Sequence, residues 1–124
     1  MSFILDTNTV DEVDRAEFVH EALGMTMVPI ELHWLDARRT VTAQGIITDL
    51  GDLTVCTGRT TSHRVERTPA LARDDMEPCI FVNVQVSGTG TVVQGGRAAV
   101  QHPGDLVIYD STAPYTLLND NGMT

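Results

Sequence analysis

Lysine is absent from this sequence, and positively charged side chains are scarce altogether. The 124 residues carry 8 cationic side chains, all of them arginine, against 17 aspartates and glutamates, so the formal net charge is −9. Contacts with phosphate backbones need clustered cations, which disfavours nucleic-acid binding by this stretch of chain. Anionic lipid surfaces attract the same cations, so the charge balance also disfavours a membrane partner.

Long apolar runs and cysteines are lacking too. No segment approaches the ~18 consecutive apolar residues that a membrane-spanning helix needs. The opening residues 1–6 lack the basic region of a signal peptide, so we expect a cytoplasmic protein. Cys56 and Cys79 are too few for a disulfide framework. We interpret them as two buried, unreactive thiols in a reducing compartment, with a single disulfide between them as the alternative.

The composition that is present is that of one globular domain. Hydrophobic residues make up 42% of the chain and charged residues 20%, which is typical of globular rather than disordered sequences. A length of 124 residues also corresponds to one domain. We therefore expect a single domain over residues 1–124.

One stretch near the start predicts a helix over residues 10–23. Thr9 and Glu12 have the spacing of a capping box. Apolar side chains follow at helical steps, namely Val13, Ala16, Val19 and Leu23. Gly24 stands where a helix C-cap is expected.

The rest of the chain, over about residues 28–118, predicts β structure. Short runs rich in Val, Ile and Thr are separated by turn residues about every 8–12 positions, the spacing of a sandwich or a small barrel. About eight or nine short antiparallel strands are expected, at 28–34, 41–50, 53–57, 62–68, 79–87, 91–94, 97–101, 106–110 and 115–118. Residues 69–75 predict a turn or one short helical turn. Gly95-Gly96 predicts a tight hairpin, because both central residues of that turn need positive φ.

Some of these strands carry a pattern that bears on exposure. Residues 62–68 are mostly polar and predict an exposed strand. In the strand at 79–87, Ile80, Val82, Val84 and Val86 occupy one face, and Asn83, Gln85 and Ser87 the other. Asn119 to Gly122 has the composition of a hairpin turn whose return strand is missing. We therefore expect an exposed edge at 115–118, in a fragment of a longer protein.

The residue arrangements that carry metal or catalytic chemistry are missing. His20, His33, His63 and His102 include no His-x-His pair, the spacing at which two ligands share one strand face. Ser87 lacks the glycine two residues before it that a nucleophile elbow needs. Gly88-Thr-Gly90 opens no helix, as a dinucleotide fingerprint would. We expect no metal, no cofactor and no enzymatic activity.

The most patterned stretch lies near the end of the chain. It reads Gln94-Gly-Gly-Arg97, then Pro103-Gly104-Asp105, then Leu106-Val-Ile-Tyr-Asp110, then Pro114-Tyr115. Pro103-Gly104-Asp105 predicts a tight turn, and Arg97 is placed to pair with Asp105 or Asp110 across it. In order and spacing, these motifs resemble the N-terminal, AraC-binding-like domain of AraC/XylS-type bacterial transcription regulators. The resemblance covers about residues 13–118.

This resemblance implies a small cupin-like β-barrel or jelly roll that senses an effector or mediates dimerisation. In the family, dimerising helices and DNA-binding helix-turn-helix units follow the barrel, so DNA would be contacted only through a domain absent from this chain. Some cupins place a metal-binding histidine where this sequence has Leu106-Val107-Ile108, which implies the metal-free, regulatory branch. The structural motif residues implied are Arg97, Pro103, Gly104, Asp105, Asp110, Pro114 and Tyr115.

A small-molecule effector would bind in the mouth of the barrel. Trp34, Asn83, Gln85 and Tyr109 are the candidate pocket residues. Asn83 and Gln85 share one strand face, so they are polar handles if that face points inward; the alternative places both in water. Two other functions stay open, a metal-dependent cupin enzyme of dioxygenase or isomerase type and a ligand-free interaction module. Self-association is expected through the exposed edge at 115–118.

Overall fold

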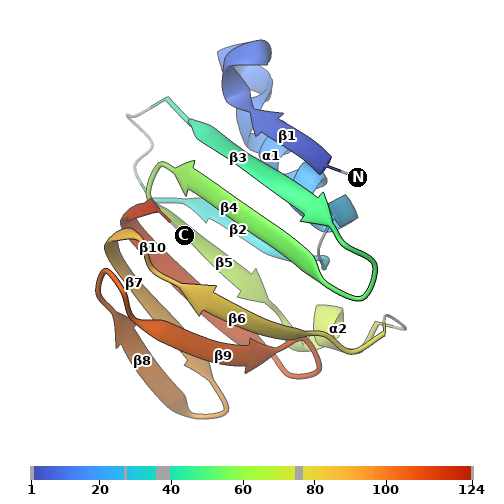
Figure 1. Cartoon of the computed structure of the whole chain (residues 1–124), viewed down its shortest axis with the longest axis vertical. Coiled ribbons are helices and arrows are strands. Elements are labelled where there is room, and N and C mark those ends of the chain that lie inside the picture. The colour runs from blue at the N-terminus through green and yellow to red at the C-terminus, as the bar shows by residue number, and fades with distance from the viewer. Residues whose placement is uncertain (1, 27, 36–39, 75–76, 124) are drawn as a thin grey trace.

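The computed structural model describes residues 2–26, 28–35, 40–74 and 77–123 and is mainly β (Figure 1). In chain order the elements are β1 (Ser2–Asp6), η1 (Thr7–Thr9), η2 (Glu12–Asp14), α1 (Arg15–Thr26), β2 (Glu31–Trp34), β3 (Ala43–Asp49), β4 (Thr54–Thr60), β5 (His63–Arg67), α2 (Pro69–Ala72), β6 (Ile80–Val84), β7 (Ser87–Gln94), β8 (Arg97–Gln101), β9 (Leu106–Asp110) and β10 (Tyr115–Met123). No helix in this part of the chain is long and apolar enough to cross a membrane. The mainly β fold with one longer N-terminal helix is confirmed, with ten strands instead of eight or nine.

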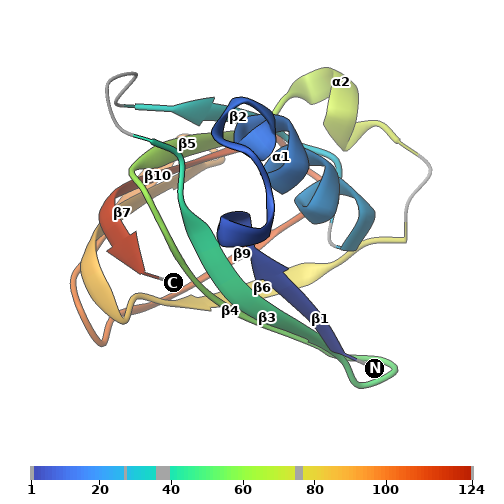
Figure 2. The same cartoon turned by 90° about the horizontal axis from the view of Figure 1, so that it is seen from above.

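Two antiparallel sheets enclose the core (Figure 2). The larger sheet has the order β1-β3-β4-β10-β5-β2, with β7 paired to β10 and β8 to β7. From Tyr115 to Asn119, β10 pairs with β5 on one side and with β7 on the other. Its Met123 pairs with Arg59 of β4. The separate β6–β9 pair closes the barrel on the side where the larger sheet is open.

The turns predicted from glycine and proline are formed. Gly95 and Gly96 have φ angles of 62° and 75° and join β7 to β8 as a tight hairpin. Gly104 has a φ of 92° in the Pro103–Asp105 turn. Its N–H donates to the Gln85 carbonyl oxygen at 2.7 Å, which ties this turn to the end of β6. Side chains other than glycine are strained at these φ angles, so glycine sets the geometry of both turns.

The core consists of two adjoining apolar clusters. The first lies within the barrel and contains Val28, Ile30, Val65, Val92, Tyr109 and Tyr115. The second lies between α1 and the β1–β3 side of the sheet and contains Leu5, Val19, Ala22 and Ala43. Leu23 and Leu32 pack against both clusters, so α1 is joined to the interior of the barrel.

The helical segment differs from the single helix predicted over residues 10–23. Two short 3-10 helices come first, and α1 follows them and continues past Gly24. The predicted capping box is not formed, because the Thr9 hydroxyl donates to the carbonyl oxygen of Asp6 at 2.8 Å instead. Local hydrogen bonding therefore turns the chain earlier than expected. As a result Val13, predicted on the buried helix face, is 87% exposed.

The structure shows which faces of β5 and β6 are buried. β5, predicted to be exposed, lies between β10 and β2 and buries His63, Val65 and Arg67. β6 and the residues after it turn their apolar side chains outward, namely Ile80, Val82, Val84 and Val86. The face of β6 that carries Phe81 and Asn83 points inward instead. Polarity alone therefore does not identify the buried face of these strands.

Both ends of the described chain belong to the larger sheet. β1, which the sequence pattern did not predict, pairs with β3 from Ser2 opposite Thr48 to Asp6 opposite Gln44. Residues 119–122 continue β10 instead of forming the predicted hairpin turn. The predicted exposed edge at 115–118 is wrong, because these residues pair with strands on both sides. The short helical turn predicted over 69–75 is confirmed as α2, and Asp75 itself lies outside the described residues.

The ion pair predicted for Arg97 is wrong. Arg97 is exposed and forms no ion pair with any residue that the structure describes. Asp105 instead accepts a hydrogen bond from the N–H of His102 at 2.8 Å. Asp110 accepts from the Thr112 hydroxyl at 2.6 Å, and hydrogen bonds from Thr112 lower the pKa of the Asp110 carboxyl. Both carboxylates thus stabilise their own turns, which is the usual role of aspartate there.

Candidate ligand-binding cavity

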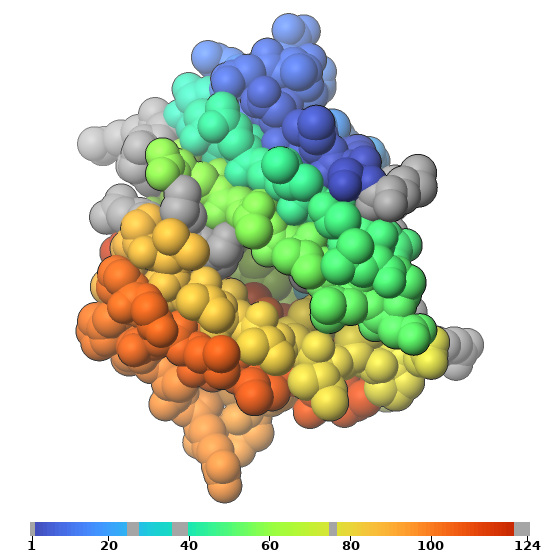
Figure 3. Space-filling model, in the orientation of Figure 1, coloured from blue at the N-terminus to red at the C-terminus, as the bar shows by residue number. Residues whose placement is uncertain are grey.

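A cavity of about 390 Å³ lies inside the barrel, between the larger sheet and the β6–β9 pair. Cavities of about 300–1,000 Å³ are typical of small-molecule sites. The mouth lies between β4 and β6, which belong to different sheets, and Figure 3 shows the hollow between them. Much of the wall is apolar and includes Val19, Leu23, Ile30, Ile47, Val65 and Leu117.

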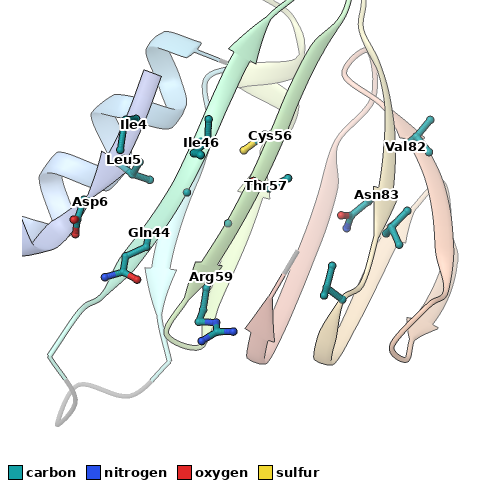
Figure 4. Close-up of a pocket in the computed structure, with 14 residues that line it drawn as sticks. Ile4, Leu5, Asp6, Gln44, Ile46, Cys56, Thr57, Arg59, Val82 and Asn83 are labelled. Atoms are coloured by element: carbon teal, nitrogen blue, oxygen red, sulfur yellow. The ribbon is translucent and has the colours of Figure 1, made fainter. Parts of the chain in front are cut away.

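An open groove of about 720 Å³ continues outward from this mouth. Figure 4 shows the groove, with Asp6 and Arg59 on the β1–β3–β4 side and Asn83 on β6 opposite them. Asp6 and Arg59 are charged, whereas the deeper cavity has no aspartate, glutamate or arginine among the described residues that line it. A molecule that enters would therefore pass Asp6 and Arg59 in the groove before it reaches the cavity, whose described lining has no such charged side chain.

Three aromatic rings form one wall of the cavity. The rings of Phe81 and Tyr109 are stacked, with centroids 5.0 Å apart and an interplanar angle of 26°. The Tyr115 centroid is 4.9 Å from that of Tyr109 and 6.1 Å from that of Phe81. Burial raises the pKa of Tyr109 and raises that of Tyr115 to about 12, so both phenols are protonated at neutral pH. Neither hydroxyl has a hydrogen-bond partner in the part of the chain that the structure describes.

The cavity lining on β3 and β4 includes two glycines. Gly45 and Gly58 face each other in register, and both line the cavity. A Cβ at Gly45 would collide with the carbonyl oxygen of Thr57, so β3 and β4 approach closely there. A Cβ at Gly58 would make only ordinary contacts, the nearest at 3.4 Å from the Gln44 carbonyl oxygen. Only Gly45 is therefore required by the packing of the sheet.

The two cysteines do not behave as predicted. Both are free, which excludes the disulfide alternative, and neither is fully buried. Cys56 lies on β4 at the junction of the cavity and the groove, while Cys79 is half-buried. Desolvation raises the pKa of the Cys56 thiol, so this thiol is protonated at neutral pH. The raised pKa agrees with the prediction that Cys56 is not activated, because the thiolate is the nucleophilic form.

A polar cluster on β4, β5 and β10 forms part of the cavity wall. His63 Nδ1 lies 2.9 Å from the Thr60 hydroxyl and 3.0 Å from the Thr61 carbonyl oxygen, and Nε2 lies 3.4 Å from Asn119 Nδ2. Burial lowers the pKa of His63, so the ring is neutral at pH 7. Neutral Nδ1–H then donates to Thr61, and Nε2 accepts from Asn119. The sequence analysis missed His63 and Asn119, although the alternation of His63 with Val65 was a signal for a buried face.

The four predicted pocket residues divide into two pairs. Asn83 and Tyr109 line the cavity. Gln85 shares the inward direction of Asn83 but is buried beyond the cavity wall, where its Nε2 donates to the Ser87 carbonyl oxygen at 2.8 Å. Trp34 does not line the cavity either, and its ring packs on His63 with centroids 5.8 Å apart. The alternative that placed Asn83 and Gln85 in water is wrong, because Gln85 is fully buried and Asn83 faces the cavity.

The predicted motif residues lie around the barrel instead of in one site. Gly104 and Asp105 form the turn between β8 and β9, and the carbonyl oxygen of Asp105 accepts from the N–H of Gln85 at 3.1 Å. Tyr115 is the one motif residue that lines the cavity. No group of three histidine, cysteine, aspartate or glutamate side chains suited to a metal ion is found among the described residues.

Comparisons with known proteins place the chain in a family. Residues 19–123 match the AraC-binding-like domain. A protein from the nit 5′ region of Bacillus sp. (strain OxB-1), itself uncharacterized, is 30% identical over 117 residues, 94% of this chain and 45% of that protein. The transcriptional activator NphR of Rhodococcus sp. is 34% identical over 85 residues, 68% of this chain and 25% of NphR.

A solved structure has the same fold. The crystal structure of the AraC-like transcriptional activator CuxR matches with a TM-score of 0.79 at 19% identity, over 99% of this chain and 45% of that chain. This chain belongs to the AraC-binding-like domain family. It spans less than half the length of these relatives.

Proposed function

We propose that this domain senses a small effector molecule on behalf of an AraC-type transcription regulator. The observation that carries the proposal is the cavity, which is largely apolar, enclosed by both sheets and reached through a mouth between β4 and β6. The family and the transcriptional activators among the relatives support a regulatory role over the metal-dependent enzyme alternative. The site of action would be the cytoplasm, where the regulated DNA lies.

The mechanism we expect is a shift between two arrangements of the domain. The cavity is lined from α1 by Leu23, from β6 by Phe81 and from β10 by Asn119, so one ligand would contact all three elements. Such a ligand favours the arrangement that closes on it, by as much as its affinities for the two arrangements differ. The change would reposition DNA-binding units that lie outside this chain.

Self-association is the second part of the proposal. The outer face of the β6–β9 pair carries apolar side chains at five adjacent positions, Ile80, Val82, Val84, Leu106 and Ile108, and Asp110 at the sixth, opposite Ile80. Two copies that each carry a net charge of −9 repel one another, except where their surfaces are uncharged. Contiguous exposed apolar side chains mark interaction surfaces. This outer face, in place of the edge at 115–118, is therefore the surface for a second copy of the chain.

The test of effector sensing follows binding and transcription together. Small molecules are screened by thermal shift, because a ligand specific to the folded state raises Tm. Molecules that bind are then tested on Gly58→Val, whose added side chain would occupy the cavity wall without a backbone collision. We expect them to raise the Tm of the unmodified chain but not of the variant, and to change reporter transcription by the regulator that carries this domain.

Two outcomes would count against effector sensing. Molecules that stabilise the unmodified chain and Gly58→Val equally would bind elsewhere. Molecules that occupy the cavity while the regulator's transcription stays unchanged would remove the link between binding and regulation.

A further inference from the structure

We propose that the cavity binds an uncharged aromatic molecule carrying a hydrogen-bond acceptor, and that the Tyr109 hydroxyl donates to that acceptor. The inference rests on the proposed function, since it names the class of effector for the same cavity. Three features carry it: the lack of charge in the cavity, its aromatic wall, and hydroxyls that have no partner.

The absence of charged side chains from the described cavity wall selects against ions. No aspartate, glutamate or arginine lines it, and His63 is neutral because burial lowers its pKa. An ion that enters such a space loses its hydration without gaining a counter-charge, which is strongly unfavourable. The net charge of −9 repels an anion further. An uncharged molecule carries neither cost.

The shape and the walls of the cavity suit a flat ring. Phe81 and Tyr109 stack in one wall, while Gly45 and Gly58 add no side chain to the part of the lining that they form on β3 and β4. A ligand ring gains from offset or edge-to-face contact with the aromatic wall. The volume of about 390 Å³ equals that of roughly 13 water molecules, at ~30 Å³ each. One ring with a small substituent therefore fits.

The polar groups of the cavity indicate what that substituent is. Tyr109 and Tyr115 have buried rings, yet neither hydroxyl is hydrogen-bonded to any described residue. Neither hydroxyl is among the fully buried polar atoms that lack a partner, so each keeps some accessible surface, and an acceptor on the ligand would accept a hydrogen bond from Tyr109 there. Asn83 donates its Nδ2 to Gln101 Oε1 at 3.3 Å, which leaves the Asn83 side-chain oxygen for a donor on the ligand. An aromatic amide offers both groups.

The experiment compares four probes by NMR titration of the isotopically labelled chain. Benzamide is uncharged, aromatic and has an acceptor; benzoate is an anion; cyclohexanecarboxamide lacks the aromatic ring; toluene lacks the acceptor. We expect benzamide to bind at least about tenfold more tightly than benzoate and several-fold more tightly than cyclohexanecarboxamide. Shifts should concentrate at cavity residues, and Gly58→Val should weaken all the probes that bind there.

A single substitution isolates the role of Tyr109. Tyr109→Phe removes only the hydroxyl, so the affinity for benzamide should fall roughly five- to tenfold, the effect of one hydrogen bond. Toluene is the matched control, and its affinity should stay unchanged in the same variant. If Tyr109→Phe altered the shape of the cavity, toluene binding would change as well.

The outcomes separate this inference from the proposed function. Benzoate or cyclohexanecarboxamide binding in the cavity as tightly as benzamide would overturn the ligand class and leave effector sensing standing. Equal benzamide affinity in Tyr109→Phe, with toluene unchanged, would overturn the assignment to Tyr109. If none of the four probes shifted the cavity residues, the inference would be overturned, and the sensing role would still be decided by the thermal-shift screen and the reporter assay.

Discussion

Arg67 joins four segments of the fold through one buried guanidinium group. Its Nε donates to the Ser111 carbonyl oxygen at 2.8 Å, its Nη1 to the Pro29 carbonyl oxygen at 2.9 Å, and its Nη2 to Asp74 Oδ1 at 3.1 Å. These contacts tie β5 to the turn before β10, to the chain entering β2, and to the residues after α2. The side chain is only 2% exposed, so each contact is shielded from water.

We predict that Arg67→Met lowers the free energy of unfolding by about 3 kcal/mol, because it removes the Arg67 hydrogen bonds to two carbonyl oxygens and to the Asp74 carboxylate. Arg64→Met is the matched control on the same strand. Arg64 pairs with Glu66 at 3.1 Å, but its side chain is partly exposed, so its loss should cost less than about 1 kcal/mol. Urea unfolding of both variants measures the difference. Equal losses would show that the Arg67 contacts add nothing beyond a surface ion pair.

At the residue scale the sequence located part of the cavity. Asn83 and Tyr109 were found because strand alternation and a barrel mouth are properties of short segments. Trp34 and Gln85 were misplaced because their surroundings depend on which strands meet. His63 was missed because it lies in a strand whose polar composition favoured exposure. That strand is buried only through the pairing of β5 with both β10 and β2.

At the scale of elements, most strands were predictable from turns and alternation. Gly95-Gly96 forms the hairpin between β7 and β8, and Pro103-Gly104-Asp105 forms the turn from β8 to β9, so the strands beside these local turn signals were located well. β10 was predicted too short, because residues 119–122 have the composition of a turn. Pairing with β7 through Asn119, Asp120 and Met123, and with β4 at Met123, overrides that preference and keeps the segment extended.

This pairing predicts how the amides of β10 exchange with solvent. Residues 115–119 have a strand on each side, so their amides are hydrogen-bonded whichever way they point. β1 pairs only with β3, and β6 pairs only with β9. We expect amides at 115–119 to exchange at least about ten times more slowly than those at 2–6 or 80–84, measured by hydrogen exchange with NMR. Faster exchange in β10 than in β1 would contradict the central position of β10.

At the scale of the whole molecule, the two sheets leave an apolar outer face on β6 and β9. The pattern of strand 79–87 showed that its valines share one side, and we expected the polar side to be either inward or in water. Which side faces out depends on how the two sheets are placed, since Phe81 and Asn83 line the cavity while Ile80 and Val82 are exposed. No local sequence pattern contains that information.

We predict that Ile108→Glu reduces self-association of this chain. Ile108 lies on the outer face, is exposed, and does not line the cavity, so the substitution adds a charge to the proposed contact and leaves the core intact. Val13→Glu is the control, since it adds the same charge at an exposed position on the helical segment. Sedimentation over a range of concentrations should show dimers for the unmodified chain and for Val13→Glu, and monomers for Ile108→Glu. A monomer at every concentration for all three would refute self-association.

The central place of β10 has a consequence for how the protein is made. β5 and β7 leave the ribosome before β10 does, and each lacks one of its two partner strands until residues 115–123 emerge. Until then both present open strand edges, which are prone to pair with other chains. The larger sheet therefore cannot close until β10 has been synthesised. Slow codons just before residue 115 would lengthen the time during which the edges of β5 and β7 stay open. A nascent chain that stalls there has most of the cavity's residues but not the strand that holds them together.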